Sequence, residues 1–183
     1  MRKLAFALAM LASPAAATGL SIEIQSGETV LGTVEIDLFE ADAPNHVKQI
    51  STLAAEGAYD NVVFHRVIQG FMAQTGDVEH GKLGADMRRA GTGASHLPNI
   101  DAEFGSLSFE RGIVGMARSR SPNSANAQFF IMFAPAPHLN GQYTVVGEVT
   151  SGMDVVDTIK LGLGANGAVL GAPDFMKSVT VTE

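Results

Sequence analysis

The strongest constraint on the fold is a series of short runs in which apolar and polar residues alternate. Between residues 20 and 39 apolar residues recur at every second position in two stretches, first at Leu20, Ile22 and Ile24 and again at Val34, Ile36 and Leu38. This period of two predicts strands with one buried face, here two strands joined by a turn near Ser26-Gly27. Further β-forming runs cover residues 62–64, 67–72, 113–117, 129–133, 145–149 and 178–182.

Only two segments show helical spacing. Residues 44–57 begin with a proline, which suits a first helical turn, and end with a glycine. They place Val47 and Ile50 on one face and Gln49 on another, and a second helix is expected over 153–160. Many short strands with two helices favour a mainly β fold, a barrel capped by helices, over a βαβ sheet.

The N-terminus has the pattern of a secretory signal peptide. Arg2 and Lys3 precede an apolar run over 4–11, and three alanines occupy positions 15–17. The apolar run is shorter than the ~20 residues that span a bilayer. We therefore expect residues 1–17 to be removed, leaving 18–183 as a single domain without a membrane anchor. The expected destination is the periplasm, with full secretion left open.

The charge and the cysteine count exclude several classes of function. The 183 residues contain 12 Lys and Arg against 19 Asp and Glu, a formal net charge of −7. This sign disfavours binding to nucleic acid phosphates. Because the chain has no cysteine, it has no disulfide, thiolate metal site or cysteine nucleophile.

Three familiar motifs are incomplete. Residues 162–167 read G-x-G-x-x-G, but they follow no predicted strand and open no predicted helix, so we interpret them as a flexible surface loop. The five histidines show no pairing at metal-ligand spacing, and no serine stands in a G-x-S-x-G turn. The sequence thus gives no indication of a cofactor or a metal.

Residues 64–77 combine groups that do not suit a simple core strand. If 67–74 is one strand, the face that carries Ile68 and Met72 also carries Arg66 and Gln74, and Gly70 marks a bulge. A solvent-facing position for the polar residues is the alternative interpretation.

A second group of residues, over 115–143, adds further aromatic and amide side chains. Together the two segments could form a shallow apolar cup rimmed by donors, as in many small-ligand or peptide sites. For each aromatic residue taken singly, plain core packing is the competing interpretation. The cup would be lined by Phe71, Met72, Phe130 and Leu139, and rimmed by Arg66, Gln74, Arg118 and Gln128.

These segments resemble the signature of the cyclophilins, a family of peptidyl-prolyl cis-trans isomerases. The matching elements are F-H-R-V-I-x-G-F-M-x-Q-x-G-D at 64–77, G-x-x-x-M-A at 112–117, Q-F-F-I at 128–131 and H-L-N-G-x-Y-x-V-x-G-x-V at 138–149. The resemblance extends from about Ile22 to Val181. It implies a closed eight-stranded antiparallel β-barrel capped by two α-helices.

The resemblance also assigns roles by position. It implies that Arg66 is the essential guanidinium, that Phe71, Met72, Phe130 and Leu139 form a proline pocket, and that Gln74, Ala117 and Gln128 contact the peptide. Three further residues expected to bind the substrate, Arg118, His138 and Tyr143, depart from the pattern of many members. Arg118 replaces Asn, His138 replaces the Trp of cyclosporin-sensitive members, and Tyr143 replaces His.

The resemblance therefore predicts a peptidyl-prolyl cis-trans isomerase (EC 5.2.1.8) that needs no cofactor. The expected partners are proline-containing polypeptides, above all unfolded exported proteins. We expect a monomer that binds cyclosporin weakly, since a histidine at 138 offers less stacking area than a tryptophan. The alternative function is a proline-peptide binding module or holdase without significant turnover.

Overall fold

The computed structural model describes residues 18–183, so the predicted signal peptide lies outside the described residues. The strands are β1 (Gly19–Ser26), β2 (Thr29–Leu38), β3 (Val62–Val63), β4 (Arg66–Ile68), β5 (Met72–Thr75), β6 (Ile113–Met116), β7 (Phe129–Met132), β8 (Val145–Ser151) and β9 (Phe175–Thr182). The helices are α1 (Pro44–Ala55) and α2 (Met153–Thr158), with single 3-10 turns η1 (Pro137–Leu139) and η2 (Ala165–Gly167). Both predicted helices and the predicted β1–β2 pair are confirmed.

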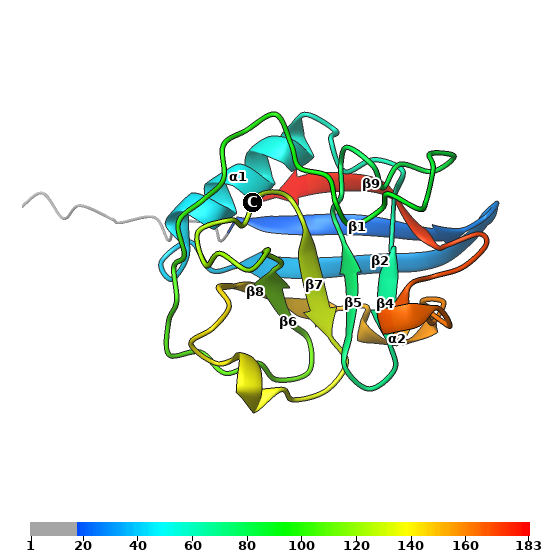
Figure 1. Ribbon diagram of the computed structural model, residues 1–183. Helices are drawn as coiled ribbons and strands as arrows, with labels where there is room; N and C mark the ends of the chain where they lie inside the picture. The colour runs from blue at the N-terminus through cyan, green and yellow to red at the C-terminus, as the bar shows by residue number, and fades with distance from the viewer. Residues whose placement is uncertain (1–17) are drawn as a thin grey trace, which may run out of the picture.

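All nine strands join one antiparallel sheet in the order β3-β9-β1-β2-β8-β6-β7-β5-β4 (Figure 1). The sheet curls strongly, so that β4 and β5 cross in front of β1 and β2. The order is linear, and within residues 18–183 the end strands β3 and β4 are not paired with each other. The structure is therefore a curled half-barrel of nine strands. The prediction of an antiparallel, mainly β fold with two helices is confirmed, but the closed barrel of eight strands is not.

The alternation in β1 and β2 places one face of each strand in the core. Ile22 and Ile24 of β1 are buried, as are Val34 and Ile36 of β2. These side chains belong to the same apolar cluster as Ile50 of α1. Burying such side chains stabilises the fold by about 1.5–3 kcal/mol each. The strands therefore pair in the register that keeps these alternating apolar side chains in the core.

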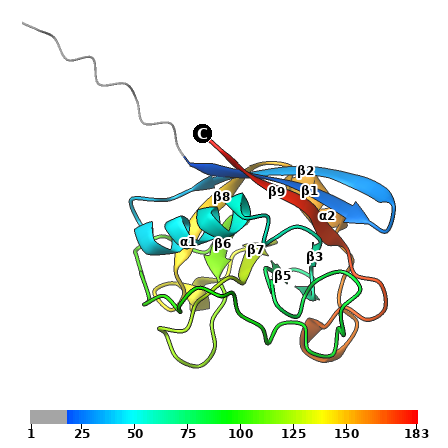
Figure 2. The ribbon, with the colours of Figure 1, turned by 90° about the horizontal axis from the view of Figure 1, so that it is seen from above.

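Helix α1 lies beside β9, away from α2 (Figure 2). It begins at Pro44, and the preceding Ala43 supplies no side-chain cap. The carboxylate of Glu103 takes this role, because it accepts hydrogen bonds from the main-chain N–H groups of Asn45 and His46, each at 3.1 Å. A residue from a distant loop thus satisfies the free donors of the first turn.

The face of α1 that carries Gln49 is covered as well, which the sequence did not indicate. The Gln49 side chain is buried, and its amide donates to the carbonyls of Pro98 and Asn126 at 3.1 and 3.0 Å. The end of the long loop over 76–99 and the segment that precedes β7 each offer one main-chain acceptor to this face of α1. Helical spacing alone does not reveal such a partner.

The predicted bulge at Gly70 was also wrong. Residues 66–75 form a hairpin, in which β4 and β5 are joined by a turn where Gly70 has φ 67°. Pairing across this hairpin sets Arg66 opposite Gln74 and Ile68 opposite Met72. The four side chains do share a face, as the sequence predicted, but through cross-strand pairing rather than along a single strand.

A second apolar cluster lies apart from the main core and forms the floor of the candidate site. Its buried members are Met72, Phe109, Phe130, Met132, Ala136, Leu139 and Val145. Phe71, Ala117 and Tyr143 pack against it while remaining partly exposed. Among residues 18–183, no helix has the length and apolar character to cross a membrane.

Candidate active site

Ten of the eleven residues predicted for the site line one surface cavity of about 320 Å³. They are Arg66, Phe71, Met72, Gln74, Ala117, Arg118, Phe130, His138, Leu139 and Tyr143. The eleventh, Gln128, lines an adjoining cavity of about the same volume, whose wall also includes Gln74, Ala117 and Arg118. The fold therefore brings all eleven residues into one continuous region.

The floor of the first cavity is apolar and tightly packed. Met72, Phe130 and Leu139 are each more than nine-tenths buried. The ring of Phe130 stacks on Phe109 with centroids 5.7 Å apart. A Cβ atom on Gly115 would lie only 2.6 Å from Phe130 Cζ, so the absence of a side chain at Gly115 makes room for this ring. The result is a preformed apolar floor open at one side.

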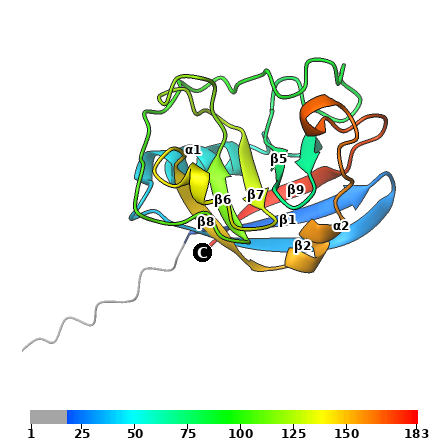
Figure 3. The same cartoon turned by 60° about the horizontal axis from the view of Figure 1, so that its bottom comes forward.

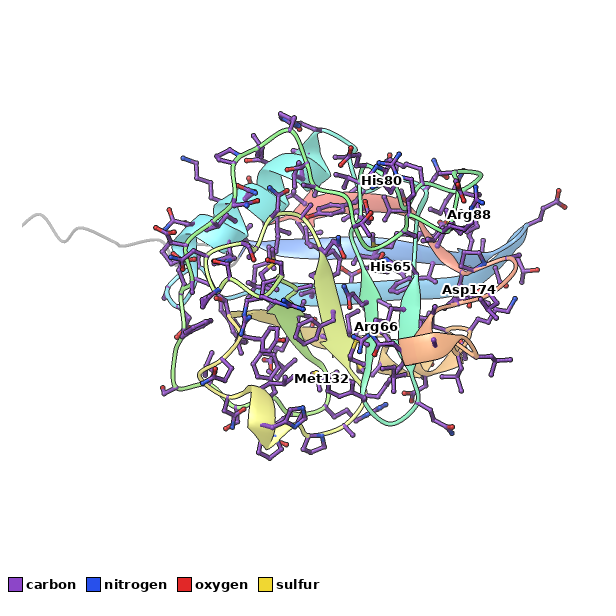
Figure 4. The ribbon with its side chains drawn as sticks, viewed as in Figure 1. His65, Arg66, His80, Arg88, Met132 and Asp174 are labelled. Atoms are coloured by element: carbon purple, nitrogen blue, oxygen red, sulfur yellow. The ribbon has the colours of Figure 1, made fainter. Side chains whose placement is uncertain are left out.

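Arg66, labelled in Figure 4, lines this cavity, and its guanidinium is held by neutral acceptors. Its Nη1 donates to Gln74 Oε1 at 3.2 Å and contacts Met72 Sδ at 3.7 Å. Its Nε donates to the carbonyl of Asn166 at 2.9 Å, and its Nη2 donates to Asn166 Oδ1 at 3.2 Å. Burial lowers the pKa of the guanidinium, but the group stays protonated at neutral pH.

A guanidinium carries five N–H groups. The four contacts of Arg66 within residues 18–183 therefore leave one N–H on Nη2 for a ligand. Arg66 forms no ion pair with any residue of this range. Its positive charge is thus oriented without being neutralised.

The hydrogen-bonded chain continues beyond Arg66 into the adjoining cavity. Gln74 Nε2 donates to Gln128 Oε1 at 3.0 Å, and Gln128 Nε2 donates to the carbonyl of Gly93 at 3.0 Å. Gly93 is held in turn by the carboxylate of Asp77, which accepts its N–H at 3.0 Å. These amides leave the site with fixed donors and acceptors along one wall.

The three positions that depart from the common cyclophilin pattern also line the first cavity. The His138 ring stacks on Phe71, with centroids 5.8 Å apart. The guanidinium of Arg118 lies 4.4 Å from the centre of the Tyr143 ring and donates to the carbonyl of Gln142. The Arg118 side chain is therefore engaged with its own wall of the cavity.

His65, next to Arg66 in the chain, is buried behind the site. Neither of its ring nitrogens has a hydrogen-bond partner among the described residues. Burial lowers the pKa of His65 to about 4, and the nearby charge of Arg66 acts in the same direction. His65 is thus neutral at pH 7 and adds no second charge beside the guanidinium.

The sequence did not single out Asn166 or Gly93. Asn166 lies in the G-x-G-x-x-G segment, which sequence reasoning interpreted as a flexible surface loop; its contact with Arg66 bridges 100 positions. No local pattern signals such a contact. Within residues 18–183, no three His, Asp or Glu side chains gather closely enough to hold a metal ion.

Comparison with known proteins identifies the family to which this chain belongs. The family described as "cyclophilin type peptidyl-prolyl cis-trans isomerase/CLD" matches residues 20–181. The chain belongs to the cyclophilin family. A "probable peptidyl-prolyl cis-trans isomerase" of Brucella suis is 56% identical over 152 residues, which cover 82% of this chain and 78% of the relative.

Solved structures resemble this cyclophilin over nearly its full length. A cyclophilin-type isomerase of Cryptosporidium parvum superposes with a TM-score of 0.76 at 26% identity, covering 92% of this chain and 99% of its own. A second structure of that protein, in the presence of the dipeptide Ala-Pro, gives a TM-score of 0.73 at the same identity, covering 90% and 99%. The predicted family is confirmed.

Proposed function

We propose that this cyclophilin accelerates cis-trans isomerisation of X-Pro bonds in exported proteins, with Arg66 donating a hydrogen bond to the prolyl nitrogen. One observation carries this proposal. The free N–H of an oriented, unneutralised Arg66 stands at the edge of a cavity of about 320 Å³, whose apolar floor offers a surface for a proline ring.

The chemistry requires a donor rather than a nucleophile. Rotation about an X-Pro bond faces a barrier of about 18–20 kcal/mol, because amide resonance must be broken. At a barrier of about 20 kcal/mol the bond rotates roughly 0.01 times per second. Raising this to about 10²–10³ per second needs about 6 kcal/mol of stabilisation that acts only in the transition state.

Arg66 is suited to supply part of this stabilisation. When the C–N bond twists, the nitrogen lone pair localises and becomes a hydrogen-bond acceptor. A cationic donor at that atom stabilises the twisted state more than the planar ground state. Gln74 and Asn166 hold the donor in place, so little reorganisation is needed at the moment of rotation.

The remaining site residues would hold the substrate while one flank turns. Phe71, Met72, Phe130 and Leu139 would anchor the ring of the proline. Gln74, Ala117, Arg118 and Gln128 would bind the chain before the proline, while His138 and Tyr143 would border the other side. The reaction makes and breaks no covalent bond, so these roles involve binding and orientation only.

The proposed location is the periplasm. It is supported by the basic start, the apolar run over 4–11 and the alanines at 15–17. Expression of the full chain in a Gram-negative host should yield a periplasmic protein whose first residue is Thr18. Recovery of the intact chain in the cytoplasm would contradict this part of the proposal.

Exchange NMR on an Ala-Pro peptide tests the activity. Residues 18–183 at a concentration far below that of the peptide should produce cis-trans exchange many times faster than in the free peptide. Arg88→Ala, which removes an exposed arginine far from the cavity, should leave this exchange unchanged. Peptide binding without faster exchange would instead favour the binding-module alternative.

A further inference from the structure

The segment 162–169 packs tightly on β4. Gly162 N–H donates to the carbonyl of Val67 at 2.9 Å, and Val169 N–H donates to the carbonyl of His65 at 3.0 Å. Gly167 lies so close to Ile68 that a Cβ atom there would overlap the Ile68 side chain. These contacts fix the segment, coloured orange in Figure 3, beside β4 and β5.

Asn166, at the centre of this segment, has an unusual backbone conformation. Its φ and ψ of 56° and 29° are left-handed, a region that non-glycine residues seldom occupy and that asparagine tolerates best. In this conformation its main-chain carbonyl and its side-chain oxygen both accept hydrogen bonds from Arg66.

The two hydrogen bonds that Asn166 accepts from Arg66 complement the one that Gln74 accepts. Asn166 engages Nε and Nη2, whereas Gln74 engages Nη1. The planar guanidinium is therefore held at both edges, which restricts rotation about its own axis. Both side-chain acceptors are neutral amides, so the guanidinium keeps the charge that a carboxylate partner would offset.

We propose that Asn166 is a positioning residue for the isomerase reaction, acting by aiming the Nη2 edge of Arg66 at the prolyl nitrogen. This proposal rests on the role proposed above for Arg66. It predicts that loss of the Asn166 side chain lowers kcat while KM stays nearly constant, because the apolar pocket that binds proline is untouched.

Asn166→Gly is the sharpest variant. Glycine accepts a positive φ and keeps the main-chain carbonyl that binds Nε, so only the Oδ1 contact is lost. Asn61→Gly is a matched control, since Asn61 has nearly the same φ of 58° but its main chain bonds with Met176 and Leu83, on a different segment. We expect kcat to fall about fivefold in Asn166→Gly and to be unchanged in Asn61→Gly.

A double-mutant cycle separates positioning from general support of the loop. Lysine at position 66 has no Nη2 group, so Asn166→Gly should have no further effect in the Arg66→Lys background. An equal fractional loss in both backgrounds would mean that Asn166 merely supports the structure, and would overturn the proposal. So would parent-like kcat in Asn166→Gly.

A readout independent of activity completes the test. In ¹⁵N NMR of the parent, rotation about the Arg66 Nε–Cζ bond should be slow, and in Asn166→Gly it should be faster. Unchanged rotation would overturn the proposal. If Arg66→Ala instead retains full activity, the proposed role of Arg66 fails, which is a different result from failure at Asn166 alone.

Discussion

His65 should make the protein progressively less stable as the pH falls below neutrality. Its side chain is only 8% exposed, and burial lowers its pKa to about 4. In the unfolded chain a histidine has a pKa of about 6.5. Between these two values the unfolded chain binds a proton that the folded chain does not. The free energy of unfolding therefore falls as the pH is lowered through this range.

The size of the effect follows from the two pKa values. At about 1.4 kcal/mol per pKa unit, the full difference corresponds to about 3.5 kcal/mol, of which about 2.5 kcal/mol is lost by pH 4.5. Phenylalanine at this position has a similar shape and no proton to bind. In His65→Phe this part of the pH dependence should disappear.

Urea unfolding of the parent and His65→Phe at pH 7.5 and 4.5 measures this contribution. Both proteins share all other titrating groups, so the difference between their unfolding free energies isolates His65. On going from pH 7.5 to 4.5, the free energy of unfolding of the variant should rise by about 2.5 kcal/mol relative to that of the parent. Parallel pH dependences in the two proteins would show that His65 does not lower the stability of the folded chain at acid pH.

Four further predictions concern the site and its support. Gly115→Ala places a Cβ atom 2.6 Å from Phe130 Cζ; it should raise KM for proline peptides and lower stability by about 1–3 kcal/mol in urea unfolding. In Asp77, burial raises the carboxyl pKa, but hydrogen bonds from His80, Gly93 and Gly91 outweigh it and lower the pKa. Asp77→Asn should therefore destabilise the protein by about 2 kcal/mol at pH 7, and an unchanged melting temperature would contradict this. Calorimetry with cyclosporin should give a micromolar or weaker Kd, because His138 lacks the area and N–H of an indole; a nanomolar Kd would contradict this. Turnover should be flat between about pH 6 and 8 and insensitive to EDTA, since Arg66 stays protonated there and no metal takes part in the proposed reaction; loss of turnover on chelation would contradict the mechanism.

The strands and helices of this protein were predictable where local pattern decides the structure. The alternation around Val34 and Ile36 and the helical spacing of Val47 and Ile50 each reflect a single buried face. Such patterns are visible within ten or so residues. They sufficed to predict β1, β2 and α1 within a few residues of their observed ends.

Local patterns did not suffice where a distant segment decides the structure. Gln49 is buried because main-chain acceptors at 98 and 126 meet its amide. Gly70 allows a hairpin rather than a bulge, a choice that depends on pairing between β4 and β5. Whether the sheet closes into a barrel depends in the same way on how all nine strands pair and curl.

The candidate site shows the same division. Its residues could be selected because the motif over 64–77 and the later segments are specific to the cyclophilins. Their convergence on one cavity follows from pairings of β5 with β7 and of β7 with β6, which no local pattern reveals. Asn166 escaped prediction because its contact with Arg66 joins segments 100 positions apart.

The most direct test of the account is to separate binding from turnover in Arg66→Ala. Titration of an Ala-Pro peptide gives the affinity, and exchange NMR on the same samples gives the isomerisation rate. The account predicts that the variant binds the peptide within about threefold of the parent, because the apolar pocket remains, but loses most of the exchange, about a hundredfold. Exchange as fast as in the parent would show that Arg66 does not carry the reaction.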